Sequence, residues 1–354
     1  MLSRRRGPRA LQLPRDRADE APSPRAAPAG VERVDVRADH VWGMVMAQAG
    51  IRASDIASFL GAKMTGDDRT VARPMPFHAA GPGDMTFWQG GLPPDRMPAG
   101  SLVLMTAKAA QSAAAAPCSV IVMEHPRAGF ARAVNEFFAP RAPASIAATA
   151  RIAPTARIGA NVHIGEFVVV RDNAVVGAGS RLCDHAVLAE GVVLGERCIV
   201  GEHAVVGCEG FGNELDGDEM VDFPHLGTVR IADDVRIGAG STIARGTLSD
   251  TVIGRGTRIS QGVNVAHNVR IGELCTITGQ AQISGSVTIG DRCWLGPNCS
   301  IIQKVRIGAR SQIGIGATVL GNLPDDSVCM DVDGLSRSEY RILRAWLSQQ
   351  GAKR

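Results

Sequence analysis

The chain is poor in aromatic residues and in net charge. Phe, Trp and Tyr make up 4% of its 354 residues, and the formal net charge is +3 at pH 7. No apolar run approaches the ~20 residues of a membrane-spanning helix, and the eight cysteines include no CxxC pair. We therefore expect a soluble cytoplasmic protein with reduced thiols, without a membrane span and without a nucleic-acid partner.

An aliphatic residue returns at every sixth position through the second half of the chain, and we call these the clock residues. The first run is Ile146, Ile152, Ile158, Ile164, Val170, Val176, Leu182, Leu188, Leu194, Val200 and Val206. The second run is Ile231, Ile237, Ile243, Ile253, Ile259, Val265, Ile271, Ile277, Ile283, Ile289, Leu295, Ile301, Ile307, Ile313 and Val319. A six-residue period of this kind is typical of a parallel β-helix.

Three hexads form one triangular coil, so the clock residues should point inward and stack on their counterparts about 4.8 Å away. A second inward position, four residues after the clock, is small. It is occupied by Ala156, Ala174, Ala186, Cys198, Ala204, Cys275, Cys293 and Cys299. We predict that these thiols lie in the core. The spacing leaves the hand of the coil open, because the usual right-handed crossover rule is not a guide here.

The chain divides into four parts by composition. Residues 1–45 are rich in Arg, Pro and Ala and should be disordered, unless translation begins at Met44 or Met46. Residues 46–142 form a small α/β domain, residues 143–322 the β-helix, and residues 323–354 a C-terminal segment with a short helix.

The α/β domain has recognisable elements. Ser54 is placed to cap a helix that Gly61 ends. Apolar runs predict strands at 102–105 and 119–123, and helices are expected at 107–114 and 127–138. Such a domain is able to close an open end of the β-helix or to bind a ligand.

Two insertions interrupt the clock. The longer one, residues 208–228, carries Phe211, Phe223 and Pro224, which we expect to anchor it. The shorter one is ARGTLSDTVIG, one coil before VNVAHNVRIG. Long loops in compact domains are usually functional, so the insertions mark a candidate site.

His267 is the candidate catalytic residue beside these insertions. It follows the clock residue Val265 by two positions, so its side chain should leave the corner of the prism. An imidazole is suited to act as a general base near neutral pH. An inert surface histidine is the alternative for such a residue taken alone.

The sequence resembles the UDP-3-O-acylglucosamine N-acyltransferase family of lipid A synthesis. The motifs that carry the resemblance are DMTFW, GCEGFG, IARGTLSDTVIG, VAHNVRIG and ISGSVTIG. The resemblance implies a left-handed parallel β-helix, a homotrimer with active sites between subunits and a uridine-binding N-terminal domain. It also implies that an acyl-carrier-protein thioester is the donor, carried on phosphopantetheine, with no other cofactor and no metal.

The resemblance also assigns roles to individual residues. His267 falls on the catalytic base, and Gly285 on the glycine whose backbone N–H resembles the oxyanion donor. Phe87 falls on an aromatic residue that stacks on uracil. Asn264 and Asn268 flank the base at substrate-contact positions.

The chain departs from the family at several of these positions. Ser260, followed by Gln261, stands where the family has an aspartate that orients the histidine, and serine cannot offset the charge of an imidazolium. Lys304 replaces a second histidine but still supplies a cation for a phosphate. Pro94 lies near the place of a second uracil-stacking aromatic residue. The C-terminal helix is shorter than the family's.

Three other functions stay open. A shorter donor such as acetyl-coenzyme A and another nucleotide-linked amino sugar are compatible with these departures. A non-catalytic paralogue would bind nucleotide sugar or carrier protein without turnover. A zinc enzyme is the third, because His185 and His203 lie one coil apart and should stack, although His163 is out of register with them.

Overall fold

The computed structural model describes residues 50–89, 97–113, 117–140 and 143–330. The chain forms two compact units that divide after Pro140, and each is described by itself. The predicted leader 1–45, the alternative starts Met44 and Met46, the Pro94 position and the C-terminal helix lie outside the described residues. Within the described ranges, no helix is both long and apolar enough to cross a bilayer.

The first unit is a small α/β domain around a five-stranded sheet of order β2-β7-β6-β5-β4. The strands of the whole unit are β1 (Ile51–Arg52), β2 (Lys63–Thr65), β3 (Thr70–Val71), β4 (Arg73–Pro74), β5 (Asp84–Trp88), β6 (Leu102–Met105) and β7 (Ser119–Val122). Its helices are α2 (Ala53–Leu60), α3 (Ala107–Ser112) and α4 (Pro126–Phe137), with a 3-10 turn at Phe77–Ala79. The strands predicted at 102–105 and 119–123 and the two helices near them match β6, β7, α3 and α4.

One detail of this unit differs from the sequence expectation. Helix α2 does end at Gly61, which adopts φ of 62°, but Ser54 is not its cap. Ser54 lies in the first turn, and its backbone N–H donates to Oδ1 of Asp68 at 2.9 Å. The Asp68 carboxylate therefore satisfies one of the free N–H groups at the helix start, that of Ser54, a role that local sequence does not reveal.

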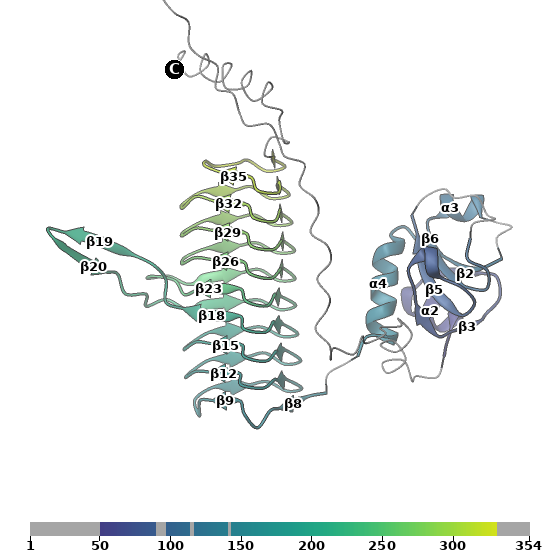
Figure 1. Ribbon diagram of the computed structural model, residues 1–354, viewed down its shortest axis with the longest axis horizontal. Coiled ribbons are helices and arrows are strands. Elements are labelled where there is room, and N and C mark those ends of the chain that lie inside the picture. The colour runs from purple at the N-terminus through teal and green to yellow at the C-terminus, as the bar shows by residue number, and fades with distance from the viewer. Residues whose placement is uncertain (1–49, 90–96, 114–116, 141–142, 331–354) are drawn as a thin grey trace, which may run out of the picture. The chain divides into compact units, whose positions relative to one another are not determined.

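The second unit is a parallel β-helix whose short strands stack into three sheets (Figure 1). The β8 sheet contains β8 (Ser145–Ile146), β11 (His163–Ile164), β14 (Arg181–Leu182), β17 (Ile199–Val200), β22 (Arg236–Ile237), β25 (Arg258–Ile259), β28 (Thr276–Ile277), β31 (Trp294–Leu295), β34 (Gln312–Ile313) and β36 (Val328–Cys329). The β9 sheet contains β9 (Arg151–Ile152), β12 (Val169–Val170), β15 (Val187–Leu188), β18 (Val205–Cys208), β23 (Thr242–Ala244), β26 (Asn264–Val265), β29 (Gln282–Ile283), β32 (Ser300–Ile301) and β35 (Thr318–Val319). The β10 sheet contains β10 (Arg157–Ile158), β13 (Val175–Val176), β16 (Val193–Leu194), β21 (Val229–Ile231), β24 (Thr251–Ile253), β27 (Arg270–Ile271), β30 (Thr288–Ile289) and β33 (Arg306–Ile307).

The clock residues build the core of this unit. From Ile164 to Val319 each of them is nearly or fully buried, because each points into the prism and is covered by the coils on both sides. The predicted fold class, mainly β with a parallel β-helix of hexapeptide repeats and a small α/β domain before it, is confirmed, and the left hand of the coil stays a prediction from the resemblance. The first three clock residues are less covered. Ile152 and Ile158 are partly buried, and Ile146 is 55% exposed, because its strand is the terminal strand of the β8 sheet and has a neighbour on one side only.

The predicted core thiols are buried. Cys198, Cys275, Cys293 and Cys299 are at most 1% exposed. Burial raises the pKa of Cys198 to about 11 and that of Cys299 to about 11, because a thiolate is poorly solvated in the prism. These cysteines are therefore packing residues.

The long insertion leaves the prism after β18 and contains an antiparallel hairpin of β19 (Asn213–Asp216) and β20 (Glu219–Asp222). Figure 1 shows this hairpin standing out from the side of the stacked coils. The expectation that Phe211, Phe223 and Pro224 anchor the loop is wrong for the isolated chain. Phe211 is 87% exposed, Phe223 is 46% exposed, and Pro224 is exposed. The buried side chain of the loop is His225 instead.

Candidate active site

One corner of the prism, where the strands of the β9 sheet end, collects every irregularity of the repeat. The long loop leaves this corner after β18, the short bulge follows β23, and His267 and Gly285 follow β26 and β29. Strands β23, β26 and β29 pair in sequence. His267 and Gly285 each follow a clock residue by two positions, so they occupy the same turn position in adjacent coils.

The Nδ1 atom of His267 is held by two neighbours. It lies 3.0 Å from Oδ1 of Asn268 and 3.2 Å from Oγ1 of Thr247. Oδ1 of Asn268 also accepts hydrogen bonds from the backbone N–H and the hydroxyl of Thr247. The amide nitrogen of Asn268 donates to the carbonyl oxygen and hydroxyl of Ser249, and this fixes the amide orientation. Nδ1 therefore carries the proton, and the lone pair of His267 is on Nε2.

The backbone of Gly285 lies close against the His267 ring. A Cβ atom on Gly285 would be 2.6 Å from Nε2 of His267, so a side chain at this position would displace the ring. The backbone carbonyl of His267 accepts a hydrogen bond from Ser286, and that of Gly285 from Lys304, each at 2.9 Å. These bonds fix the spacing between base and glycine.

The N–H of Gly285 is not hydrogen-bonded within the described residues. At the same turn position elsewhere, the N–H groups of Glu166 and Glu273 donate to aspartate oxygens of the next coil, at 2.9 and 2.8 Å. This turn therefore presents an N–H that binds an anionic oxygen. At Gly285 the equivalent residue of the next coil is Gln303, and among the described residues it accepts no hydrogen bond from the Gly285 N–H.

Ser260 and Gln261 do not join this cluster within the chain. They follow β25, at the corner where the β8 sheet ends, and the Ser260 hydroxyl donates to Oε1 of Gln261 at 2.8 Å. Both line a separate pocket of 340 Å³, together with Arg181 and Arg236. The place expected for Ser260 beside Nδ1 of His267 is occupied by Asn268 and Thr247.

The remaining predicted contact residues are dispersed. Asn264 lies in β26, and its Oδ1 accepts a hydrogen bond from Thr242 at 2.9 Å. Lys304 is exposed two coils beyond Asn268 and adopts φ of 63°. Phe87 lies in β5 of the first unit, half-buried, with its ring centroid 5.2 Å from that of Phe130.

His225 is a site residue that the sequence pattern did not single out. Its side chain is 1% exposed, and its ring lies edge to face against that of His267, with centroids 5.1 Å apart. Its backbone N–H donates to Oε1 of Glu209 at 2.9 Å. A Cβ on Gly210 would collide with the imidazole of His225. Gly210, the first glycine of GFG, therefore leaves the space that the His225 ring occupies. In the sequence, Gly210 was the only available indication that a side chain is buried here.

His185 and His203, the two histidines considered as possible metal ligands, do stack. Their ring centroids lie 4.6 Å apart and the rings are almost parallel. Across the described residues, however, no group of three or more His, Cys, Asp or Glu side chains is arranged to hold a metal ion. The stack continues to Phe167, whose ring is 5.1 Å from His185. It is an aromatic ladder on the outer turn.

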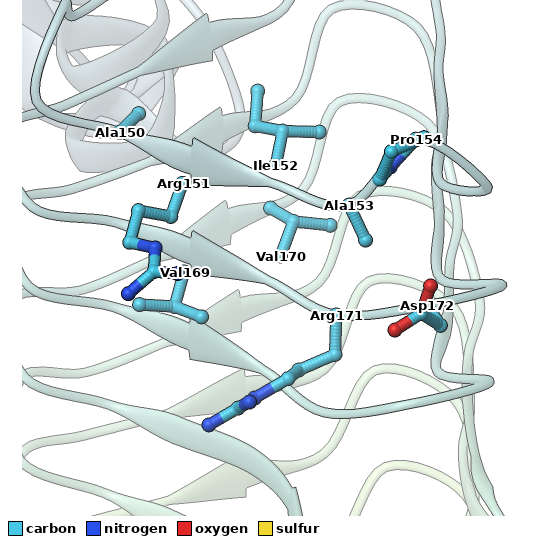
Figure 2. Close-up of a pocket in the computed structure, with 9 residues that line it drawn as sticks. All are labelled: Ala150, Arg151, Ile152, Ala153, Pro154, Val169, Val170, Arg171 and Asp172. Carbon is cyan, nitrogen blue, oxygen red and sulfur yellow. The ribbon is translucent and has the colours of Figure 1, made fainter.

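A further pocket of 490 Å³ lies among the first coils (Figure 2). Figure 2 shows Arg151, Arg171 and Asp172 around it, on strands β9 and β12 and the turn that follows. Asp172 already accepts a hydrogen bond from Thr155 at 2.8 Å. Strands β15, β18 and β23 separate this pocket from the His267 strand along the sheet.

Two parts of the solenoid match described repeat families. Residues 286–321 match the bacterial transferase hexapeptide (six repeats), and residues 156–184 match the hexapeptide repeat of succinyl-transferase. Both matches lie within the clocked region.

Several curated relatives of the chain share one name. The chain is 51% identical over 77 residues to the UDP-3-O-acylglucosamine N-acyltransferase of Polynucleobacter necessarius, a stretch that covers 21% of this chain and 22% of that protein. It is 47% identical over 78 residues to the protein of the same name from Granulibacter bethesdensis, covering 22% and 23%. The matched stretch therefore spans less than a quarter of these curated relatives.

Solved structures with a similar chain include two UDP-N-acetylglucosamine acyltransferases. That of Bacteroides fragilis is 28% identical with a TM-score of 0.48, over 52% of this chain and 70% of the other. That of Francisella novicida is 23% identical with a TM-score of 0.49, over 56% and 73%. The resemblance inferred from the sequence is confirmed by the repeats and the relatives: the chain carries bacterial transferase hexapeptide repeats and is similar to UDP-3-O-acylglucosamine N-acyltransferases over about a fifth of its length.

Proposed function

We propose that the protein is an N-acyltransferase of lipid A synthesis. It transfers an acyl group from an acyl-carrier-protein thioester to the 2-amine of a UDP-3-O-acylglucosamine-type acceptor. The names of its relatives support the acceptor and the reaction class. One structural observation supports the chemistry above the others: the proton of His267 is held on Nδ1, which leaves the lone pair on Nε2, and the ring lies close against the backbone of Gly285.

The proposed step follows from this arrangement. The amine nitrogen attacks the thioester carbonyl carbon, and Nε2 of His267 takes the proton that the nitrogen loses. The carbonyl oxygen becomes an oxyanion, which the free N–H of Gly285 stabilises. When the C–S bond breaks, the proton on Nε2 passes to the departing thiolate, so the donor leaves as a thiol and His267 returns to its neutral form with Nε2 free.

The partners of this reaction are part of the proposal. The donor thioester is a co-substrate, and no metal or redox cofactor takes part in the step. Phe87 stacks on the uracil ring, for which its half-buried side chain retains exposed surface. Lys304 supplies a cation for a phosphate at the exposed corner beyond Gly285. The protein is cytoplasmic and a homotrimer, in which a second subunit completes the site.

Purified full-length protein tests the reaction directly. It is incubated with UDP-linked amino sugars and either acyl-loaded carrier protein or acetyl-coenzyme A, and products are identified by mass spectrometry. We expect an acylated UDP-3-O-acylglucosamine with the carrier-protein donor. Turnover with acetyl-coenzyme A alone would identify another nucleotide amino-sugar acetyltransferase. Sugar binding without any turnover would identify a non-catalytic paralogue. A solution mass of a stable monomer at micromolar concentration would contradict the intersubunit site.

A further inference from the structure

The β19–β20 hairpin of the long loop is acidic and uncovered. It carries Glu214, Asp216, Asp218, Glu219 and Asp222, and neither lysine nor arginine. All five carboxylates are exposed, and within the described residues none of them makes a hydrogen bond or an ion pair. A two-stranded hairpin by itself is only marginally stable in water, so a surface that covers this one would stabilise it.

The pairing of the two strands sorts these residues by face. Glu214 pairs with Val221, and Asp216 pairs with Glu219. Paired residues share one face of a hairpin, as do alternate residues of a strand. These four residues therefore form one side of the hairpin, which we call the acidic face. The other residues of the two strands lie on the opposite face: Asn213, Leu215, Met220 and Asp222.

A row of arginines lies on the outer surface of the β8 sheet. Four outward residues of successive coils pair in this order: Arg181, Ile199, Arg236 and Arg258. The three arginines are exposed, and within the described residues none of them is ion-paired. Arg258 donates to the backbone carbonyl of Gly256 at 2.9 Å. We call these four residues the arginine row, and its positive charge has no carboxylate partner in the chain that the structure describes.

The arginine row surrounds a hollow. Arg181, Ile199 and Arg236 line the pocket of 340 Å³ at this corner of the prism. Among the described residues that line it, Glu202 is the only carboxylate. The pocket therefore keeps an excess of positive charge, on a surface that Ile199 makes partly apolar.

The acidic face and the arginine row match in composition and in height along the prism. Three carboxylates and a valine stand on one, and three guanidinium groups and an isoleucine on the other. The hairpin leaves the prism after β18, and Ile199 lies in β17, the preceding strand of the same coil. Arg181 lies one coil before Ile199 and Arg236 one coil after it. In a ring of copies around an axis parallel to the prism, the two surfaces meet at the same height.

The hairpin is also long enough to reach a neighbour. Each of its strands has four residues, which gives a length of about 14 Å at about 3.4 Å per residue. It stands out from the side of the stacked coils (Figure 1). A hairpin of this length can lie across the surface of an adjacent prism.

We propose that the acidic face of the hairpin docks on the arginine row of a second copy of the chain. This inference rests on the homotrimer of the proposed function and names the surfaces that join its subunits. Opposite charges across a contact direct association and fix its register. The docked hairpin closes the pocket of the second copy, and its opposite face points away from the row.

Reversing the charges tests this contact in the full-length protein. Sedimentation velocity gives the dissociation constant of the assembly, and hydrogen exchange with mass spectrometry gives the protection of the hairpin amides. Arg181→Glu with Arg236→Glu should raise the dissociation constant at least about tenfold and speed exchange in the hairpin. Glu214→Arg with Asp216→Arg should do the same. All four substitutions together should restore both readouts, because the charges are again opposite. The four residues are exposed, so the fold should tolerate each change.

The opposite face of the hairpin supplies the controls. Asp222→Arg makes the same change of charge there and should leave association and exchange unchanged. Leu215→Ser with Met220→Ser should also leave them unchanged.

Several outcomes would overturn the docking. One is unchanged association and exchange in both charge-reversed pairs. Another is loss of association in the Leu215→Ser, Met220→Ser variant alone, which would place the opposite face in the contact. A monomeric wild-type chain would overturn the docking and the homotrimer together. If the four substitutions restore the assembly but no acyl transfer is found with any substrate, the proposed reaction fails while the docking stands.

Discussion

The backbone of Gly285 lies against Nε2 of His267 so closely that a Cβ atom would come within 2.6 Å of it. Gly285→Ala should therefore push the imidazole out of its place without straining its own backbone, since Gly285 does not adopt a positive φ. We expect the rate of acyl transfer to fall by about 10²-fold, the scale for misplacing a catalytic group by about 1 Å.

The chain supplies a matched control for this variant. Gly279 occupies the same turn position on the β8 sheet, and a Cβ there would have its nearest neighbour, the carbonyl of Gln261, at 3.5 Å. Gly279→Ala should leave the rate unchanged in the same assay. Equal losses in both variants would mean that the turn, and not the contact with His267, is what activity requires.

His267→Ala removes the proposed base. General-base catalysis contributes about 10²–10⁴ in rate, so kcat should fall by that order while the affinity for the UDP-sugar changes little. Steady-state kinetics with the best donor and acceptor pair measures both. His203→Ala, which removes an exposed stacked ring, should keep full activity. Wild-type turnover in His267→Ala would place the base elsewhere.

The β-helix was predictable because its core contacts repeat with a fixed period of six residues. One aliphatic residue in six specifies the strand, its inward face and its partner one coil away, so Val265 and Ile283 fix where His267 and Gly285 emerge. The long loop has no such period. Its buried residue, His225, is set by contacts with Glu209, Gly210 and His267, which no local pattern in the sequence reveals.

Within one chain Ser260, which the resemblance places at the orienting position, does not contact His267, for a related reason. Ser260 is seven residues before His267, and six residues carry the chain from one face of the prism to the next. The two side chains therefore leave different corners. The actual partner, Thr247, is twenty residues away in sequence and meets His267 because the bulge turns back over the previous coil. The contacts of an insertion that breaks the repeat cannot be predicted from residue spacing.

The helix start in the first unit gives a prediction on pH. The N–H of Ser54 and the guanidinium of Arg52 hold the pKa of Asp68 below its usual value of 3.8. The folded pKa is below the unfolded one, so this stabilisation is present above about pH 4 and is lost as the pH falls through the folded pKa. Asp68→Asn should lower the urea midpoint at pH 7 and show a smaller deficit near pH 3. Asp67→Asn, at an exposed neighbour, is the control. A deficit that does not depend on pH would refute the linkage.

The buried cysteines give a prediction on reactivity. Burial raises the pKa of Cys198 and that of Cys299 to about 11, so both remain protonated thiols at pH 8 in the folded chain. Iodoacetamide should label them slowly in native protein and rapidly in urea, with mass spectrometry assigning each site. Equal labelling rates in the two conditions would show that the core of the prism opens readily.

The last prediction separates two candidate partners of His267, Asn268 and Ser260. Asn268→Asp keeps an oxygen about 3.0 Å from Nδ1 of His267 but adds a negative charge, which stabilises the protonated imidazole. The acid limb of the profile of kcat/KM against pH should move to higher pH. Positive φ at this position is tolerated by Asp as by Asn, but the variant loses the hydrogen bond from the Asn268 amide nitrogen to the carbonyl of Ser249, so its urea midpoint is measured alongside.

Ser260→Asp is the contrasting variant in this experiment. Within one chain Ser260 bonds to Gln261 at another corner, so a carboxylate there should leave the acid limb where it is. If the limb moves with Ser260→Asp and not with Asn268→Asp, the orienting group reaches His267 from a second subunit. The contacts with Asn268 and Thr247 would then be secondary to that intersubunit contact.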